Sequence, residues 1–583
     1  MPATELCINH GRPVMRLFVA PSLLVLGLLA GACGGRTVQP WQYAPRPMAD
    51  TLAILEPVEN EIPLVYESAH QFVIRPIGEP FTTDGEALNA DTQDEVVNST
   101  WFTNRNAVAP LAPEEVRRGP QTIDGPVPPL TVTDVDPEGV TPKFNVEDAN
   151  GITYIVKLDP AEHPELASGA EVVATNLFWA AGYNTPENYV YYVDPSELEL
   201  EDGVEIYLFG EDSLPIQYEV AADEVDEREL TLEIFNREFF GNRPRRADGR
   251  VRAMASRFLE GIPKGPFNYA GTRPDDPNDV VPHEHRRELR GLYVMEAWLH
   301  QTDTKAGNSL DMFILGPGSP EDEEARRWGF LRHNLIDFGS ALGSAAVRPH
   351  VPRHGQENSF DLAVMGKRFI TLGLYRKPWQ SETDVTYPPA AGYYTSKNFD
   401  PDGWKPNIPN PAFDNLTARD GYWGAKLVMS FTDAQLFAAV EAGQYSDPEA
   451  ARYILRGLRE RRDMTGRYWL AQVSPLDDPR IESGALVFDD LWIRYFGGLA
   501  QYRWEFDWEA PDPDLEAEGE STVPSIVIPR PEGSVTLEEE DPTESLARLR
   551  VWKIQADSER APRPATFWLE WTGGGWRLVG ARY

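Results

Sequence analysis

HQTDTKAGN, at residues 300–308, is the stretch of this chain that decides our prediction of its fold. It ends a strongly amphipathic helix that we expect over 284–302, and it places Asp303, Lys305 and Asn308 in one loop. A carboxylate and an amide can bind a metal ion, and a lysine can bind a phosphate group. The loop therefore predicts phosphate chemistry.

A second stretch, NLIDFGSALG at 334–343, supplies another carboxylate. Apolar runs predict strands over 311–316 and 329–336, with an acidic loop between them. Asp337 directly follows the second of these strands. Mg²⁺ prefers oxygen ligands and takes one or two protein carboxylates while keeping several waters. We therefore expect Asp337 to belong to the same site.

A β-hairpin is expected upstream of these loops. The β-rich runs FNVE at 144–147 and ITYIVKL at 152–158 flank the turn DANG, and Lys157 lies near the end of the second strand. The segment GAEVVATNLFWAAG at 169–182 is predicted to be a helix, with Glu171 in its first turn.

Phosphoryl transfer needs a lysine on the phosphates and a carboxylate that holds this lysine. Lys157 and Glu171 provide such a pair, and Glu162 or Glu165 is an alternative partner for the lysine.

The order and spacing of these residues resemble the protein-kinase-like superfamily, in an atypical branch. Asp303 and Asn308 are five residues apart, with Lys305 two residues after the aspartate, as in the catalytic loop of protein kinases. LIDFGSALG is similar to the metal-binding loop of phosphoinositide kinases. The run GVTPKF at 139–144, the hairpin and the following helix resemble the small lobe of HipA-like kinases. The resemblance covers roughly residues 130–470.

This resemblance implies a role for each residue. Lys157 would contact the α- and β-phosphates of ATP, Glu171 would pair with Lys157, Asp303 would orient the acceptor hydroxyl, Lys305 would neutralise the transferring phosphoryl group, and Asn308 and Asp337 would hold Mg²⁺ or Mn²⁺. By position, the hinge that touches adenine would lie in MASRFLE at 254–260.

The fold class that follows is α+β, a two-lobed kinase-like fold with an N-terminal extension and a β-rich C-terminal region. We expect a signal peptide over 1–33, a tether and extension over 34–125, a small lobe with hinge over 126–270, a large lobe over 271–480 and the β-rich region over 481–583. Within these regions we expect a strand-like run at 66–75, helical hairpins over 432–475 and an acidic insertion at 510–545 that interrupts the C-terminal strands.

The first 33 residues are typical of an exported protein. LFVAPSLLVLGLLA at 17–30 is too short to span a bilayer as a stable helix but suits the core of a signal peptide. The small residues directly before Cys33 resemble the lipobox of bacterial lipoproteins, which implies lipidation of Cys33. Gly34 after this cysteine resembles the default signal for the outer membrane, so we expect a lipid-anchored protein of the cell envelope.

Composition limits the partners. The net charge of −38 argues against nucleic acid and against docking on anionic lipid head groups, so we expect membrane contact through the lipid anchor only. Both cysteines, Cys7 and Cys33, lie in the N-terminal 33 residues, which excludes disulfides and thiolate metal sites from the rest of the chain. The tryptophans of the C-terminal region are expected to form the core of a β-domain, with carbohydrate or peptide stacking as the alternative.

Two functions of different classes follow. The first is an ATP- and Mg²⁺-dependent phosphotransferase at the envelope, whose acceptor is a protein, a lipid head group or a sugar. The second is a non-catalytic lipoprotein of kinase-like fold that acts as a binding or scaffold module, because ATP is expected to be scarce outside the cytoplasm. A third possibility is transfer of a nucleotidyl group.

Overall fold

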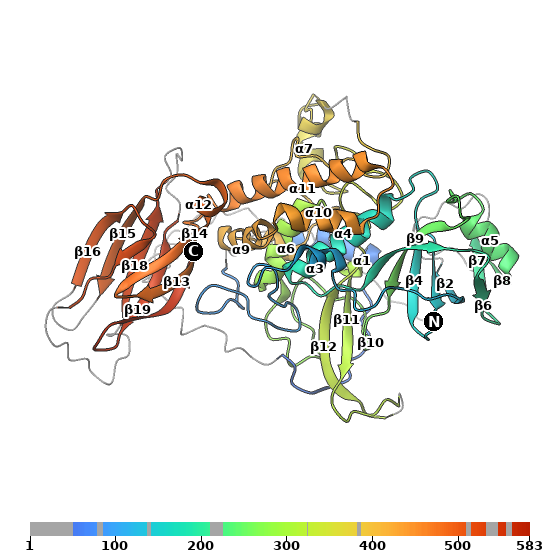
Figure 1. Cartoon of the computed structure of the whole chain (residues 1–583), viewed down its shortest axis with the longest axis horizontal. Helices are drawn as coiled ribbons and strands as arrows, with labels where there is room; N and C mark the ends of the chain where they lie inside the picture. The colour runs from blue at the N-terminus through green and yellow to red at the C-terminus, as the bar shows by residue number, and fades with distance from the viewer. Residues whose placement is uncertain are drawn as a thin grey trace, which may run out of the picture. The chain divides into compact units, whose positions relative to one another are not determined.

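The structure of the protein is a computed structural model that describes residues 50–78, 85–136, 141–209, 225–322, 325–372, 374–381, 386–508, 515–531, 546–554 and 563–583. These residues belong to one compact unit, Ala44–Tyr583. Helices and several sheets are mixed in this unit, as the predicted α+β class requires (Figure 1). Cys33, the predicted signal peptide, Gly139 and Val140 lie outside the described residues.

A six-stranded sheet forms the region that contains Lys157. Its order is β5-β9-β4-β3-β2-β6, made of Asn188–Val193, Val251–Arg257, Thr153–Leu158, Lys143–Glu147, Leu130–Asp136 and Leu198–Leu200. The predicted hairpin is confirmed as β3 and β4, which pair antiparallel with Phe144 opposite Val156. Helix α5 (Leu232–Phe240) packs on this sheet, and the Phe144 and Phe235 rings lie 5.0 Å apart between centroids. A separate two-stranded sheet pairs β7 (Glu205–Phe209) with β8 (Val225–Glu229).

Helix α4 (Leu166–Ala181) connects this sheet to the helical part of the unit. It begins three residues before its predicted start, because the Asp159 carboxylate accepts hydrogen bonds from the backbone N–H groups of Ala167 and Ser168. It ends, as predicted, at Gly182, whose φ of 135° lies in the region that favours glycine. A Cβ at Gly182 would lie 2.2 Å from the Phe102 ring.

The helical core is built from α6 and the helices that pack against it. The helices of this region are α3 (Pro113–Arg118), α6 (Arg287–Leu299), α8 (Pro411–Asp414), α9 (Ala418–Met429), α10 (Asp433–Ala442) and α11 (Pro448–Trp469). None of the described side chains of helix α7 (Leu362–Ile370) belongs to this core. The predicted helix over 284–302 is confirmed as α6, which ends where His300 adopts a left-handed φ of 59°. Helices α10 and α11 lie in the region 432–475, where helical hairpins were predicted, and their N-caps are Thr432 and Asp447.

A second hairpin carries the residues on both sides of the candidate site. Strands β11 (Ser309–Leu315) and β12 (Trp328–Leu335) confirm the two strands expected there, and they pair antiparallel. Short strands β1 (Ile54–Leu55) and β10 (Ile262–Pro263) complete a four-stranded sheet of order β1-β12-β11-β10.

The C-terminal region is β-rich, as predicted. Its strands are β13 (Leu476–Glu482), β14 (Ala485–Asp490), β15 (Tyr502–Trp508), β16 (Leu515–Ser521), β17 (Ser525–Val527), β18 (Leu546–Lys553), β19 (Ala565–Trp571) and β20 (Trp576–Arg582), with helix α12 (Leu491–Phe496) between β14 and β15. Trp508 and Trp576 are buried and pack edge to face, as expected of a β-domain core. The interpretation of 510–545 as an insertion is wrong in part, because β16 and β17 lie inside it and pair with β15 and β14.

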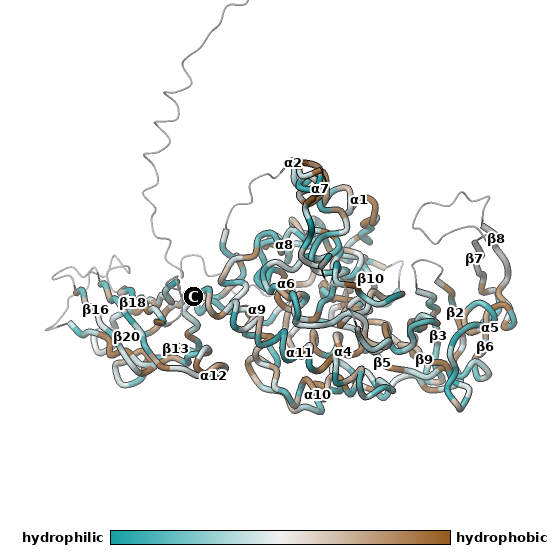
Figure 2. The backbone as a smooth tube through the Cα atoms, turned by 90° about the horizontal axis from the view of Figure 1, so that it is seen from above, coloured by the Kyte–Doolittle hydropathy of each residue, from teal (hydrophilic) through white to brown (hydrophobic). Residues whose placement is uncertain are grey.

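The strand-like run predicted at 66–75 is also wrong. This segment is helical: α1 (Leu64–Ala69) continues into a π-helix (His70–Ile74) and α2 (Arg75–Gly78). Figure 2 shows hydrophobic residues along α1 and α2, the helices on either side of the π-helix. Tertiary contacts of the polar residues decide the outcome, since Glu67 and Arg75 are buried and Arg75 pairs with Asp414. No helix in the described part of the chain is long and apolar enough to cross a membrane.

Candidate functional site

The hairpin β11–β12 explains how two distant loops meet. Asn308 and Asp337 are 29 residues apart, but the register of the hairpin pairs Ser309 with Leu335. The residues just outside the strands are therefore neighbours, and the Ile336 N–H donates to the Asn308 carbonyl at 3.0 Å. The separation is thus the length of two strands and their connection, and it leaves both loops at one end of the hairpin.

Asp303, Lys305 and Asn308 contact one another within their loop. The Lys305 ammonium lies 2.9 Å from the Asp303 carboxylate. The Asn308 amide Nδ2 donates to the Asp303 carbonyl at 2.6 Å and to its carboxylate at 3.2 Å. The loop thus holds one carboxylate between two donors, with 26% of the Asp303 side chain accessible.

Lys157 reaches this region from strand β4. Its ammonium lies 2.9 Å from the Asp337 carboxylate and 3.8 Å from the Glu171 carboxylate. Glu171 accepts a hydrogen bond from the Phe338 N–H at 3.0 Å, so it holds both the lysine and the loop after β12. The alternative Glu165 contacts the Ser446 N–H instead. The structure therefore brings together all six residues predicted for the site within the described chain.

The charges of the site act on one another strongly. Burial raises the pKa of Asp337, but the ammonium groups of Lys157, Lys305 and Lys143 outweigh it and hold this pKa below its usual range. Burial raises the pKa of the Glu171 carboxyl, and Lys157 opposes this effect only in part. The Lys157 ammonium and the Phe338 N–H thus both stabilise the charged form of this buried glutamate.

Three further residues belong to this site, through hydrogen bonds or through electrostatic interactions with its charged groups. Lys143, quoted above for the resemblance but given no role, lies on β3 directly opposite Lys157. The Gln301 amide donates to the Asp337 carbonyl at 2.9 Å. Glu67, from the N-terminal extension, accepts a hydrogen bond from the Ala306 N–H at 2.7 Å, and its negative charge raises the pKa of Lys305. Gln301 lies two residues before Asp303, so its polar side chain could have been predicted as part of the site. Nothing in the sequence near Glu67 indicates a contact with this loop.

A cavity of about 440 Å³ adjoins the loop that holds Asp303. Thr304 and Ala306 line it on one side, and Glu67 and His70 of the N-terminal helix line it on another. Asn410 also lines the cavity; it is 3% exposed, and its Nδ2 has no hydrogen-bond partner among the described residues. Its Oδ1 caps α8 by accepting the Ala412 N–H, which fixes the orientation of the amide. The cavity thus offers a buried donor to a ligand.

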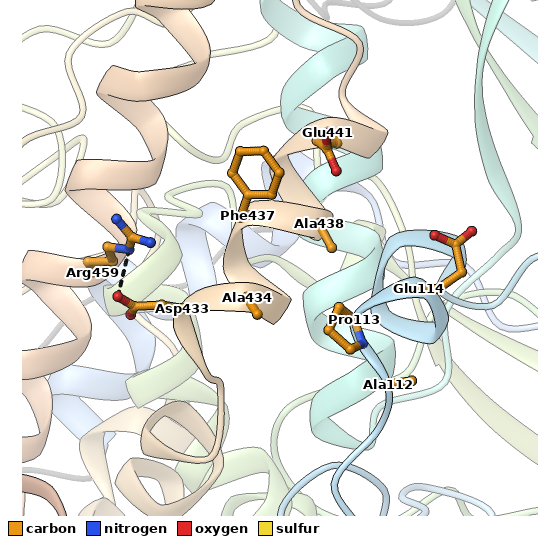
Figure 3. Close-up of a pocket in the computed structure, with 9 residues that line it drawn as sticks. All are labelled: Ala112, Pro113, Glu114, Asp433, Ala434, Phe437, Ala438, Glu441 and Arg459. Atoms are coloured by element: carbon orange, nitrogen blue, oxygen red, sulfur yellow. Dashed lines mark ion pairs between the residues drawn. The ribbon is translucent and has the colours of Figure 1, made fainter.

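A larger hollow of about 630 Å³ lies elsewhere, between α3 and α10 (Figure 3). Phe437 and the ion pair of Asp433 with Arg459 border it, and none of the residues that line it belongs to the loop at 303–308 or to the loop after β12. We therefore assign this hollow no role in phosphate transfer.

The donor set suits a metal ion that keeps water and phosphate ligands. The described residues contain no group of three or more His, Cys, Asp or Glu side chains placed to hold a metal on their own. Mg²⁺ bound with a nucleotide needs only one or two protein oxygens. Asp337 and Asn308 can supply these, and 44% of the Asp337 side chain is accessible despite its ion pair with Lys157.

The chain matches no protein-family model, no curated protein and no solved structure. An interpretation of the site therefore depends on the contacts described above.

Proposed function

We propose that this protein is a phosphotransferase of two-lobed kinase-like fold that uses ATP with Mg²⁺ or Mn²⁺. One observation carries the proposal. Lys157 and Asp337, 180 residues apart and selected from the sequence for complementary roles, form an ion pair at 2.9 Å. Asp303, Lys305 and Asn308 contact one another in the adjoining loop. Residues that matched the motif only by chance would not be expected to lie close together in the folded chain.

The proposal assigns the two lobes to two parts of the described chain. The six-stranded sheet with α5 has its own apolar core and supplies Lys157. The helices α6 and α9–α11 share another core, which includes residues of α4. Glu171 of α4 and Asp337 after β12 therefore face the lysine from the second side.

The chain's own residues account for the steps of transfer. Lys157, Lys143 and Lys305 supply positive charge to the phosphates, and Glu171 positions Lys157. The acceptor hydroxyl oxygen forms a bond to the γ-phosphorus as the bond from that phosphorus to the bridging oxygen breaks, and Asp303 takes the hydroxyl proton. Asp337 and Asn308 would hold the metal ion, which supplies charge neutralisation on the phosphate oxygens.

The acceptor would enter through the cavity beside Thr304. The residues that line this cavity include the carboxylates of Glu67 and Glu284 but no lysine or arginine, which disfavours an anionic acceptor. A hydroxyl group could accept a hydrogen bond from the Asn410 amide. Lipidation of Cys33 would keep the enzyme at the cell envelope, in the outer membrane.

The first test is the melting temperature of the chain from residue 34 onward, with and without ATP and Mg²⁺ or Mn²⁺. This chain keeps the whole compact unit, which begins at Ala44. Nucleotide at about 100 times its dissociation constant should stabilise the protein by about 2.7 kcal/mol. A rise that requires both ATP and metal supports the proposal. No rise under any condition would instead favour the non-catalytic scaffold. Release of pyrophosphate in place of ADP would indicate nucleotidyl transfer.

Asp303→Asn separates catalysis from nucleotide binding. Because the amide cannot take the acceptor proton, we expect transfer to fall about 100-fold, the lower range for loss of a general base. The stabilisation by ATP and metal should remain, since Lys157 and Asp337 are unchanged. Hydrolysis or transfer of labelled γ-phosphate measures the first effect, and thermal unfolding measures the second. If the parent chain and Asp303→Asn transferred phosphate at equal rates, Asp303 would not be the base.

A further inference from the structure

Helix α7 and the turn after it expose large apolar side chains at an unusual density. Phe369, Ile370, Leu372 and Leu374 are 84%, 82%, 91% and 85% exposed. Only one other large hydrophobic residue of the described chain, Leu499, is 80% exposed or more. We call these four residues the α7 tip. An apolar group of this kind marks a surface that meets another phase or molecule.

Cations surround the α7 tip. Lys367, Arg368 and Arg376 are exposed and form no ion pair with the described residues. Lys367 lies 5.9 Å from the Tyr375 ring. The whole chain carries a net charge of −38, so this local group of cations runs against its overall charge. Basic and apolar side chains together are typical of segments that lie at the surface of a membrane.

The base of α7 is fixed to the rest of the unit. Asp361 caps the helix through the Val364 N–H and also pairs with Lys405 at 2.9 Å. Glu357 pairs with Arg353 and with Lys377, on either side of the helix in the sequence. Figure 1 shows α7 standing beyond α11, away from the sheets. These ion pairs hold the base in place while the α7 tip stays exposed.

We propose that the α7 tip docks on a membrane surface with anionic head groups. The apolar side chains would enter the boundary between head groups and acyl chains, and Lys367, Arg368 and Arg376 would contact lipid phosphates. Local charge selects this partner over a second copy, because the exposed cations Lys367, Arg368 and Arg376 of two such tips would repel each other. The contact adds to the lipid anchor predicted at Cys33, so it departs from our expectation, drawn from the net charge, that the anchor alone meets the membrane. It does not depend on catalysis.

Vesicle sedimentation tests the proposal with the chain from residue 34 onward, which lacks the lipid anchor. We expect binding to phosphatidylcholine vesicles that contain phosphatidylglycerol, and much weaker binding to pure phosphatidylcholine. F369S/L372S should lower the partition coefficient about tenfold or more, because two large apolar groups no longer enter the bilayer. K367Q/R368Q should lower it about 5-fold per charge on anionic vesicles and little on neutral ones.

Leu499→Ser and Val527→Ser are matched controls, since these residues are 80% and 76% exposed but lie in the C-terminal region. Their binding should equal that of the parent chain. Absence of binding to anionic vesicles at low salt would overturn the proposal. So would an oligomer in sedimentation velocity that F369S/L372S dissociates, because the tip would then be an interface between copies.

Discussion

Asp337→Asn is expected to abolish the rise in melting temperature that ATP and Mg²⁺ give to the protein. The asparagine keeps the shape of the side chain but removes the charge that would hold the metal ion. It also removes the attraction that places the Lys157 ammonium 2.9 Å from Asp337. Loss of a metal's stabilisation of the transferring group costs several kcal/mol, so transfer should fall about 1,000-fold or more.

The melting temperature without nucleotide shows whether the variant folds. Lys157 retains Glu171 at 3.8 Å, so we expect the folded state to persist. Asp507→Asn is a matched control, because Asp507 is an ion-paired aspartate with a 25% exposed side chain on β15, outside the site. It should leave both nucleotide stabilisation and transfer intact. If Asp337→Asn kept the full metal-dependent shift, the assignment of the nucleotide site would be wrong.

The candidate site could be predicted from the sequence because each of its residues belongs to a locally recognisable element. Lys157 ends a strand with clear alternation, and Asp337 follows an apolar strand. Their meeting depends on the register of β11 with β12, where Ser309 lies opposite Leu335. The sequence predicts both strands but not their register. The residues of the site could therefore be predicted, but not the distances between them.

Glu67 could not be predicted in the same way. Its function depends on a contact with the Ala306 N–H, 239 residues away, that local pattern does not encode. This buried side chain lies in the segment at 66–75, which is helical and not the predicted strand. Its apolar residues Val73 and Ile74 are exposed, whereas Glu67 and Arg75 are buried and have polar partners. An apolar pattern indicates a strand only when apolar residues make the decisive contacts.

The prediction for the acidic segment at 510–545 was wrong in part for the opposite reason. Its composition suggests a solvated insertion, yet β16 pairs with β15 over seven residues. Its alternate side chains are exposed, with Glu516, Glu518 and Glu520 on one face. A strand at the edge of a sheet tolerates such charges, and they protect it from pairing with other chains.

Asp94→Asn is expected to give the largest loss of stability. Asp94 is buried, and its carboxylate accepts hydrogen bonds from Arg287 at 2.7 Å and from Arg419 at 3.0 Å. The backbone N–H of Tyr583 also donates to it, so one carboxylate ties the N-terminal extension to α6, α9 and the C-terminal residue. Removing its charge leaves two arginines without full compensation, which costs about 3–5 kcal/mol. The midpoint of urea unfolding at pH 7 measures this loss.

Asp478→Asn is the matched control. Both aspartates have a left-handed φ, 67° for Asp94 and 46° for Asp478, which asparagine tolerates. Asp478 pairs with Arg480 at 3.2 Å, but its side chain is 74% exposed. Its replacement should change stability by less than about 0.5 kcal/mol. An equal effect at both positions would show that burial of the Asp94 charge is not the cause.

The pH dependence of the Asp94→Asn effect follows from the same contacts. Burial raises the pKa of Asp94, but Arg287 and Arg419 outweigh it and lower this pKa to about 2. The carboxyl of the unfolded chain has a pKa of about 3.9. Because the folded value is the lower one, the stabilisation is complete above about pH 4 and is lost as the pH falls toward 2. The difference in unfolding midpoint between the parent chain and the variant should therefore be constant from pH 7 to pH 5 and shrink below pH 4. A difference that grows on acidification would require an unfavourable carboxylate at this position, contrary to the two arginines that contact it.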